Sequence, residues 1–74
     1  MIDNKVVGER LRQLRKQQKK TMKEVADTLN IPPSTLGMYE RGKRRAVDEN
    51  KYKLCSYYNV SIDEIFFASK KHTV

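Results

Sequence analysis

The sequence holds few of the residues from which disulfides, metal sites and catalytic centres are built. Its 74 residues include one cysteine, Cys55, and one histidine, His72. A single cysteine excludes a disulfide within the chain and a metal site made of several cysteines. There is also no paired acidic cluster and no glycine-rich phosphate loop, so we expect no enzyme activity, no metal and no cofactor.

Long apolar runs are missing as well. No stretch approaches the roughly 20 apolar residues of a membrane span. No apolar signal-peptide segment follows the first five residues, MIDNK. We therefore expect a cytoplasmic protein that makes no membrane contact, and a chain of this length can hold one domain with one small core.

Positive charge is abundant but unevenly placed. The net charge is +7, and residues 1–45 hold twelve Lys/Arg against five Asp/Glu, whereas residues 46–74 hold four of each. All of the net charge thus lies in the first part of the chain. This asymmetry favours a surface that faces a polyanion over the alternative of a solvated lysine-rich face.

Apolar periodicity and capping signals predict two helices in the first 30 residues. The first spans about residues 5–18, with Val7, Leu11 and Leu14 on one stripe. The second opens at Thr21 with Glu24 three residues later, the pattern of a capping box. Asn30 ends it, because asparagine tolerates the left-handed conformation common at helix C-termini.

Three further helices follow the Pro32-Pro33 pair. A proline suits the first helical position, so the third helix spans about residues 33–41 and stops at Gly42. The fourth spans about 48–58, and a second capping box, Ser61 with Glu64, opens the fifth. We expect an all-α, compact five-helix domain over residues 1–67 and a flexible tail over 68–74. The expected core includes Leu36, Tyr39, Cys55, Tyr58 and Phe66.

Several segments together resemble a known family. They are Arg10-Leu11-Arg12-Gln13-Leu14-Arg15, Thr21-Met22-Lys23-Glu24-Val25-Ala26, Ser34-Thr35-Leu36, Tyr39-Glu40-Arg41-Gly42 and Asn59-Val60-Ser61-Ile62-Asp63-Glu64-Ile65. In this order and spacing they resemble the Cro/C1-type (Xre-like) helix-turn-helix family of bacterial and phage repressors. The resemblance implies a lambda-repressor-like fold with the third helix in the DNA major groove.

The resemblance also implies how the protein would work. Members usually bind double-stranded DNA as twofold homodimers on palindromic operators, with half-sites about 34 Å apart. It further implies an ion pair between Arg15 and Glu40 that orients the third helix. The chain departs from the family pattern at Met22, where glutamine is frequent, and at Lys19 and Lys20, where glycine and leucine are frequent.

The third helix should supply the contacts to bases. The residues at its start and one turn later are expected to face the groove: Pro33, Ser34, Gly37 and Met38. None of them can read a base through two hydrogen bonds, as Gln or Arg does. We therefore expect specificity from thymine methyl contacts, DNA shape and close approach of the Gly37 backbone.

Basic and hydroxyl side chains around this helix should contact phosphates. These are Lys20, Lys23, Thr35, Arg41, Lys43, Arg44 and Arg45. Such contacts position a protein on DNA and make binding strongly salt-dependent. Apolar residues close to the fifth helix suggest a dimer interface, for which the candidates are Val47, Tyr57 and Phe67.

Three functions remain open at this point. The first is a transcriptional regulator, most simply a Cro-like repressor. The second is an antitoxin or control subunit that acts mainly through a protein partner, and the third is a non-specific nucleoid-type binder. An apolar patch around the fourth and fifth helices would favour the second.

Overall fold

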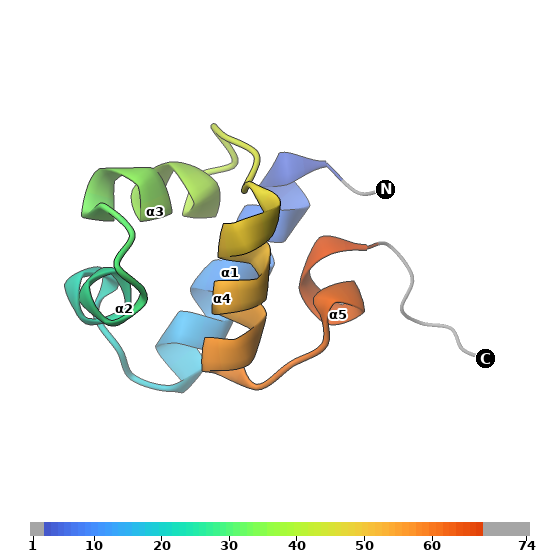
Figure 1. Ribbon diagram of the computed structural model, residues 1–74. Coiled ribbons are helices and arrows are strands. Elements are labelled where there is room, and N and C mark those ends of the chain that lie inside the picture. Colours follow the sequence, from blue (N-terminus) through green and yellow to red (C-terminus); the bar gives the residue numbers. More distant parts are fainter. Residues whose placement is uncertain (1–2, 68–74) are drawn as a thin grey trace.

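The structure is a computed structural model, and it describes residues 3–67 of the chain. Its elements are helices, as predicted: α1 (Asn4–Gln17), α2 (Met22–Leu29), α3 (Pro33–Glu40), α4 (Asp48–Tyr58) and α5 (Ile62–Phe66) (Figure 1). The all-α, five-helix prediction is confirmed, with helix ends within one residue of those expected. The expected tail over residues 68–74, which includes His72, lies outside the described residues.

Side-chain caps fix where three of the helices begin. Both predicted capping boxes are present: the hydroxyls of Thr21 and Ser61 accept from the amides of Glu24 and Glu64, and each glutamate accepts from the amide of its cap residue. The Asp3 carboxylate caps α1 by accepting from the Val6 amide at 3.0 Å. These bonds satisfy amides that a helix leaves unpaired at its N-terminus.

A left-handed residue follows four of the helices and turns the chain. The residues are Lys19, Asn30, Gly42 and Asn59, with φ between 56° and 73°. After α1, the amides of Lys19 and Lys20 bond the carbonyls of Lys16 and Arg15, and α3 ends in the same way at Gly42. Three of these positions hold residue types that tolerate this conformation, whereas Lys19 does not.

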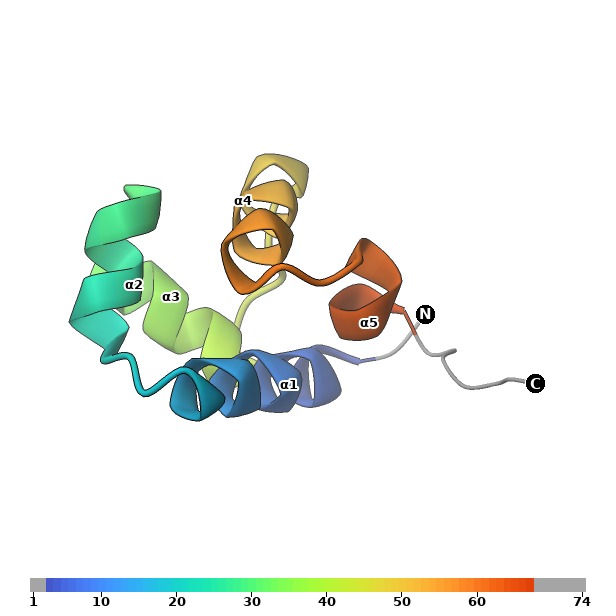
Figure 2. The same cartoon turned by 90° about the horizontal axis from the view of Figure 1, so that it is seen from below.

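α1 runs along one side of the molecule and contacts α3 and α5 (Figure 2). In two perpendicular views α2 and α3 lie together at one end of the molecule and α5 lies at the other, while α4 crosses between them (Figures 1 and 2). The most extensive helix contact is between α1 and α3. The position of α3 is therefore set mainly by α1.

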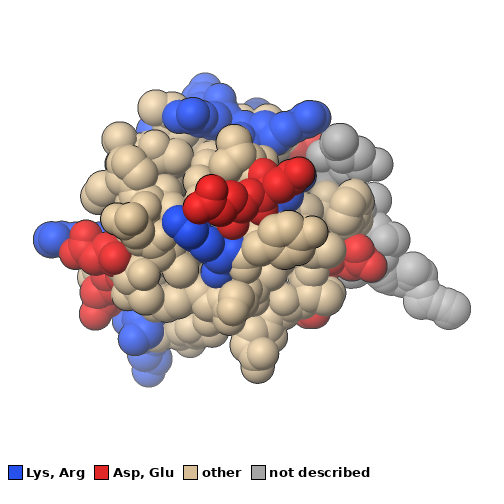
Figure 3. Space-filling model, in the orientation of Figure 1, with Lys and Arg blue, Asp and Glu red and all other residues tan. Residues whose placement is uncertain are grey.

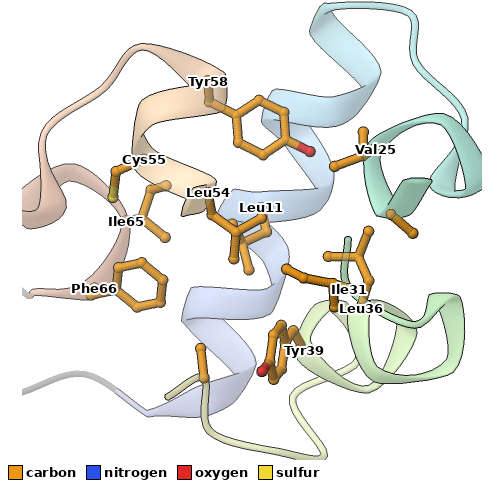
Figure 4. Close-up of a cluster of buried hydrophobic side chains, with 12 residues drawn as sticks. Leu11, Val25, Ile31, Leu36, Tyr39, Leu54, Cys55, Tyr58, Ile65 and Phe66 are labelled. Carbon is orange, nitrogen blue, oxygen red and sulfur yellow. The ribbon is translucent and has the colours of Figure 1, made fainter. Parts of the chain in front are cut away.

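The core fills the space between these helices. Leu11 of α1 is fully buried at its centre, with Leu36, Leu54 and Ile65 around it (Figure 4). All five predicted core residues are buried. The hydroxyl of Tyr58 is also buried, and among residues 3–67 it has no hydrogen-bond partner.

A candidate nucleic-acid interface on α2 and α3

The N-terminus of α3 is open. Pro32 is its N-cap residue and makes no side-chain hydrogen bond, and Pro33 occupies the first helical position. The next two amides, those of Ser34 and Thr35, therefore remain at an uncapped helix end, which attracts anions. Pro33 and Ser34 are exposed and Thr35 is half-buried, so all three lie where a ligand can reach them.

The outward side of α3 carries Pro33, Ser34 and Met38, and we call it the reading face. Met38 is half-buried and follows Ser34 by about one helical turn. Gly37 differs from the expectation. It is buried, because the Arg41 guanidinium and the Met22 thioether lie over it. The open glycine backbone predicted from the sequence is therefore covered in this arrangement.

Met22 takes a packing position at the start of α2. It is half-buried and packs against the core, and its sulfur lies 3.6 Å from where a Cβ on Gly37 would be. A thioether is apolar and adapts to irregular gaps. Met22 thus helps to join α2 to α3, in place of the polar contact that glutamine could make.

Arg15 and Glu40 form the ion pair that the family resemblance implied. The Arg15 Nε donates to Glu40 Oε2 at 2.8 Å and Nη2 donates to Oε1 at 3.0 Å. The Glu40 side chain is only 3% exposed. Arg15 Nη1 also donates to the Lys20 carbonyl at 3.1 Å. The Arg15 guanidinium thus links α1 to the end of α3 and to the segment just before α2. Its hydrogen bond to Glu40 raises the pKa of Arg15.

Gly8 of α1 allows α3 to approach closely, and the sequence analysis did not predict this. A Cβ at Gly8 would lie 2.4 Å from the Glu40 carbonyl oxygen and 2.5 Å from that of Tyr39. Both atoms belong to backbone, so α1 and α3 would have to move apart. The available signal was a glycine inside an amphipathic helix, which often marks close packing.

The loop between α3 and α4 carries Lys43, Arg44 and Arg45, and we call it the basic loop. All three side chains are exposed. Figure 3 shows Lys and Arg gathered along the molecular edge over this loop, whereas both charge signs meet over α4. The loop begins at Gly42, whose φ of +73° and contact with the Lys5 backbone leave no room for a side chain.

Two lysines predicted to contact phosphate lie near the start of α2, Lys20 before it and Lys23 in its first turn. Lys20 and Lys23 are both exposed. The Lys23 Nζ lies 2.9 Å from Asp27 Oδ2, and both side chains are largely exposed. Such a surface pair is worth less than about 1 kcal/mol, so a phosphate can replace the carboxylate.

Arg10, unlike these exposed lysines, makes several contacts within the protein. Its Nη1 donates to the carbonyls of Glu64, Ile65 and Phe67, at 3.2, 3.4 and 2.9 Å. These carbonyls lie at the C-terminal end of α5, where intrahelical partners are lacking. Arg10 therefore holds α5 against α1.

The three residues predicted for the dimer interface differ in how exposed they are. Val47 and Phe67 are 54% and 43% exposed, but Tyr57 is half-buried and its ring packs edge-on against Tyr58 with centroids 5.1 Å apart. Val47 and Tyr57 lie at opposite ends of α4. Tyr52, which was not predicted, is 67% exposed, more than any other large apolar residue between positions 3 and 67.

The described part of the chain holds no group of three or more His, Cys, Asp or Glu that could bind a metal ion. Burial raises the pKa of the Cys55 thiol, which favours the unreactive protonated form. Within residues 3–67 no helix is both long and apolar enough to span a bilayer.

Known proteins share this sequence pattern and arrangement. A family model described as helix-turn-helix matches residues 11–65. The HTH-type transcriptional regulator ImmR of Bacillus subtilis is 40% identical over 57 residues, which is 77% of this chain and 45% of that protein. The uncharacterized HTH-type transcriptional regulator YobD of the same organism is 39% identical over 57 residues, 77% of this chain and 51% of that protein.

A solved structure agrees with these matches. The restriction-modification controller protein C.AhdI from Aeromonas hydrophila superposes with a TM-score of 0.79 at 28% identity, covering 85% of this chain and 96% of that one. The chain spans about half the length of the curated relatives it matches. Since the family model covers most of the chain, the protein belongs to the Cro/C1-type helix-turn-helix family.

Proposed function

We propose that this protein is a transcriptional regulator that binds double-stranded DNA through α2, α3 and the basic loop. The observation that carries the proposal is the reading face of α3, an exposed helix side with an uncapped N-terminus and exposed basic residues beside it. This is the geometry in which a helix enters the major groove. Transcriptional regulators among the relatives support the same function. We propose a cytoplasmic location, because the protein would bind DNA there.

The contacts divide into two classes. Pro33 and Met38 offer apolar surface to thymine methyl groups, and the Ser34 hydroxyl can donate to or accept from a base edge. The phosphate contacts come from Thr35 at the helix N-terminus and from lysines and arginines on both sides of α3: Lys20, Lys23, Lys43, Arg44 and Arg45.

We further propose that the protein acts as a homodimer on a palindromic operator, most simply as a repressor that blocks promoter access. An α-helix reads only a few base pairs, so two copies are needed for a site of useful length. Exposed Val47 and Phe67 are the apolar candidates for the dimer contact, with the Tyr57 edge as a third.

Selection from random double-stranded DNA tests this function. Purified protein is offered a random duplex pool at about 150 mM salt, where non-specific phosphate binding is weakened. A palindromic motif with half-sites about one helical turn apart supports the proposal. Retention of duplex without any enriched motif, at low salt only, would contradict sequence-specific regulation and favour a nucleoid-type binder.

A control subunit that acts through a protein partner is the second candidate, and one observation favours it. A groove lies on the side of α1 turned away from α3, with Val6, Leu14 and Val60 among its lining residues. Val6 is 39% exposed there. Capture of a second protein by the wild type but not by Val6→Glu, with DNA selection failing, would establish this function instead.

A further inference from the structure

We propose that Arg41 reads a guanine in the major groove, and that position 37 is glycine because the Arg41 guanidinium lies across it. This inference rests on the proposed function, because it requires α3 to lie in the groove. It also differs from the sequence-based expectation, which placed Arg41 among the phosphate contacts.

Arg41 belongs to the reading face by its place on the helix. Ser34 and Arg41 are seven residues apart, about two turns, so their side chains leave α3 in nearly the same direction. Gly37 and Met38 lie on either side of that line. Arg41, the residue that caps α3, keeps helical backbone angles, with φ −88° and ψ −1°.

The Arg41 side chain runs back along α3 instead of outward to the basic loop. Its Nη1 lies 3.1 Å and its Cζ 3.8 Å from the position that a Cβ on Gly37 would occupy. Helical side chains lean toward the N-terminus, and this one reaches the residue four positions earlier. The guanidinium therefore lies at the middle of the reading face, where a base edge would be.

Its hydrogen-bond donors are available to a ligand. The Arg10 and Arg15 guanidiniums are held by carbonyls of α5 and by Glu40. Within residues 3–67, by contrast, no hydrogen bond or ion pair engages the Arg41 guanidinium, and the residue is exposed. Arg41 also lines a hollow together with Arg12, Arg15, Lys43 and Glu40. Four cationic side chains against one carboxylate leave this hollow positively charged, which draws DNA toward it.

A guanidinium with available donors at this position favours guanine over the other bases. Its planar pair of donors matches the O6 and N7 acceptors of guanine, the commonest specific contact in the major groove. Pro33, Ser34 and Met38 cannot form such a paired contact. Arg41 thus supplies the strong base discrimination that the rest of the reading face lacks.

The test compares binding-site profiles of the wild type, Arg41→Lys and Gly37→Ala, obtained by selection from random duplex DNA. Arg41→Lys keeps the charge but loses the paired donors. Gly37→Ala keeps Arg41 but puts a Cβ 3.1 Å from the guanidinium Nη1, so the guanidinium must shift from its place over position 37, and because the new Cβ meets only side-chain ends the fold tolerates the change. Both variants should lose preference for guanine at the same position of each half-site, with discrimination falling on the order of tenfold.

Lys43→Ala is the matched control, because it removes a nearby exposed charge outside the reading face. It should weaken all sequences alike and keep the wild-type profile. Thermal melting of each variant checks that it is folded, and Gly37→Ala should melt no lower than the wild type.

Two results would overturn the inference while leaving the proposed function intact. One is an Arg41→Lys profile identical to that of a motif-selecting wild type. The other is loss of guanine preference in Arg41→Lys but not in Gly37→Ala, which would show that Arg41 does not need glycine at position 37 to recognise guanine. If the wild type itself selects no motif, the proposed function and the inference fail together.

Discussion

The Arg15 guanidinium on α1 and the Glu40 carboxylate on α3 face each other through two hydrogen bonds, of 2.8 and 3.0 Å. About two turns earlier on α1, Gly8 lets the backbone of α3 at Tyr39 and Glu40 approach closely. Burial of Glu40 makes the pair costly to break, although such pairs contribute little net stability against apolar replacements. Its main effect is to orient α3 on α1.

Removal of the Glu40 carboxylate should therefore disturb DNA binding more than it disturbs folding. Glu40→Ala leaves the Arg15 side chain, only 14% exposed, without its partner, which costs about 3 kcal/mol of unfolding free energy. We expect loss of operator affinity well beyond the unfolded fraction. Titration of operator DNA with the folded variant measures this. Glu49→Ala, an exposed acidic control, should leave affinity unchanged, and wild-type affinity in folded Glu40→Ala would refute the orienting role.

Lys19→Gly should stabilise the protein. Lys19 has φ +56°, where a side chain costs roughly 1 kcal/mol that glycine avoids. For a domain of this size, that corresponds to a rise in melting temperature of about 4–8 °C. Asn59→Gly is the control, because Asn59 has φ +58° and asparagine already tolerates it. A gain no larger in Lys19→Gly than in Asn59→Gly would count against strain at Lys19.

Tyr58→Phe should cost no stability. The Tyr58 hydroxyl is buried without a partner in the described residues, and burial raises its pKa well above the ordinary value. Its removal relieves an unpaired polar group and loses no hydrogen bond. Tyr39→Phe is the matched control, since the Tyr39 hydroxyl accepts from Asn50 Nδ2 at 2.9 Å and its loss should cost about 1 kcal/mol. Equal losses in the two variants, measured by urea unfolding, would contradict this difference.

The capping box of α2 predicts an acid-dependent stability. The hydrogen bond from the Thr21 amide, 2.8 Å long, lowers the pKa of Glu24. Because the folded-state pKa lies below the unfolded value, the contribution is complete above the unfolded value and is lost as the pH falls through the folded value. Melting temperatures from about pH 6 to pH 3 should decline less in Glu24→Gln than in the wild type. Equal declines in melting temperature in the two proteins would show that Glu24 does not contribute to the loss of stability in acid.

The helix starts could be predicted from short sequence motifs, because each motif acts through its own hydrogen bonds or backbone geometry. Thr21 with Glu24 and Ser61 with Glu64 specify helix starts through their own hydrogen bonds, and Pro33 suits a first helical turn. Each signal depends on residues within four positions of one another. The structure places these starts at the predicted residues.

The site could be predicted only in part, because contacts between helices leave weaker traces in a sequence. A glycine inside α1 indicates close packing at Gly8, but neither Gly8 nor Arg10 shows in the sequence which segment it contacts, the end of α3 or the end of α5. The covering of Gly37 depends on Arg41 and on Met22 of another helix. The sequence predicted which basic residues surround α3, but it did not predict that the Arg41 side chain runs back over Gly37.

We expect DNA to bind to the α2–α3 side of the protein. The most direct test is nuclear magnetic resonance titration of ¹⁵N-labelled wild type with the duplex enriched by selection. The largest amide shifts are expected at Ser34, Thr35, Gly37, Met38 and the basic loop, with little change around Val6 and Val60. Shifts concentrated at Val6, Leu14 and Val60, with the α3 amides unmoved, would contradict this expectation.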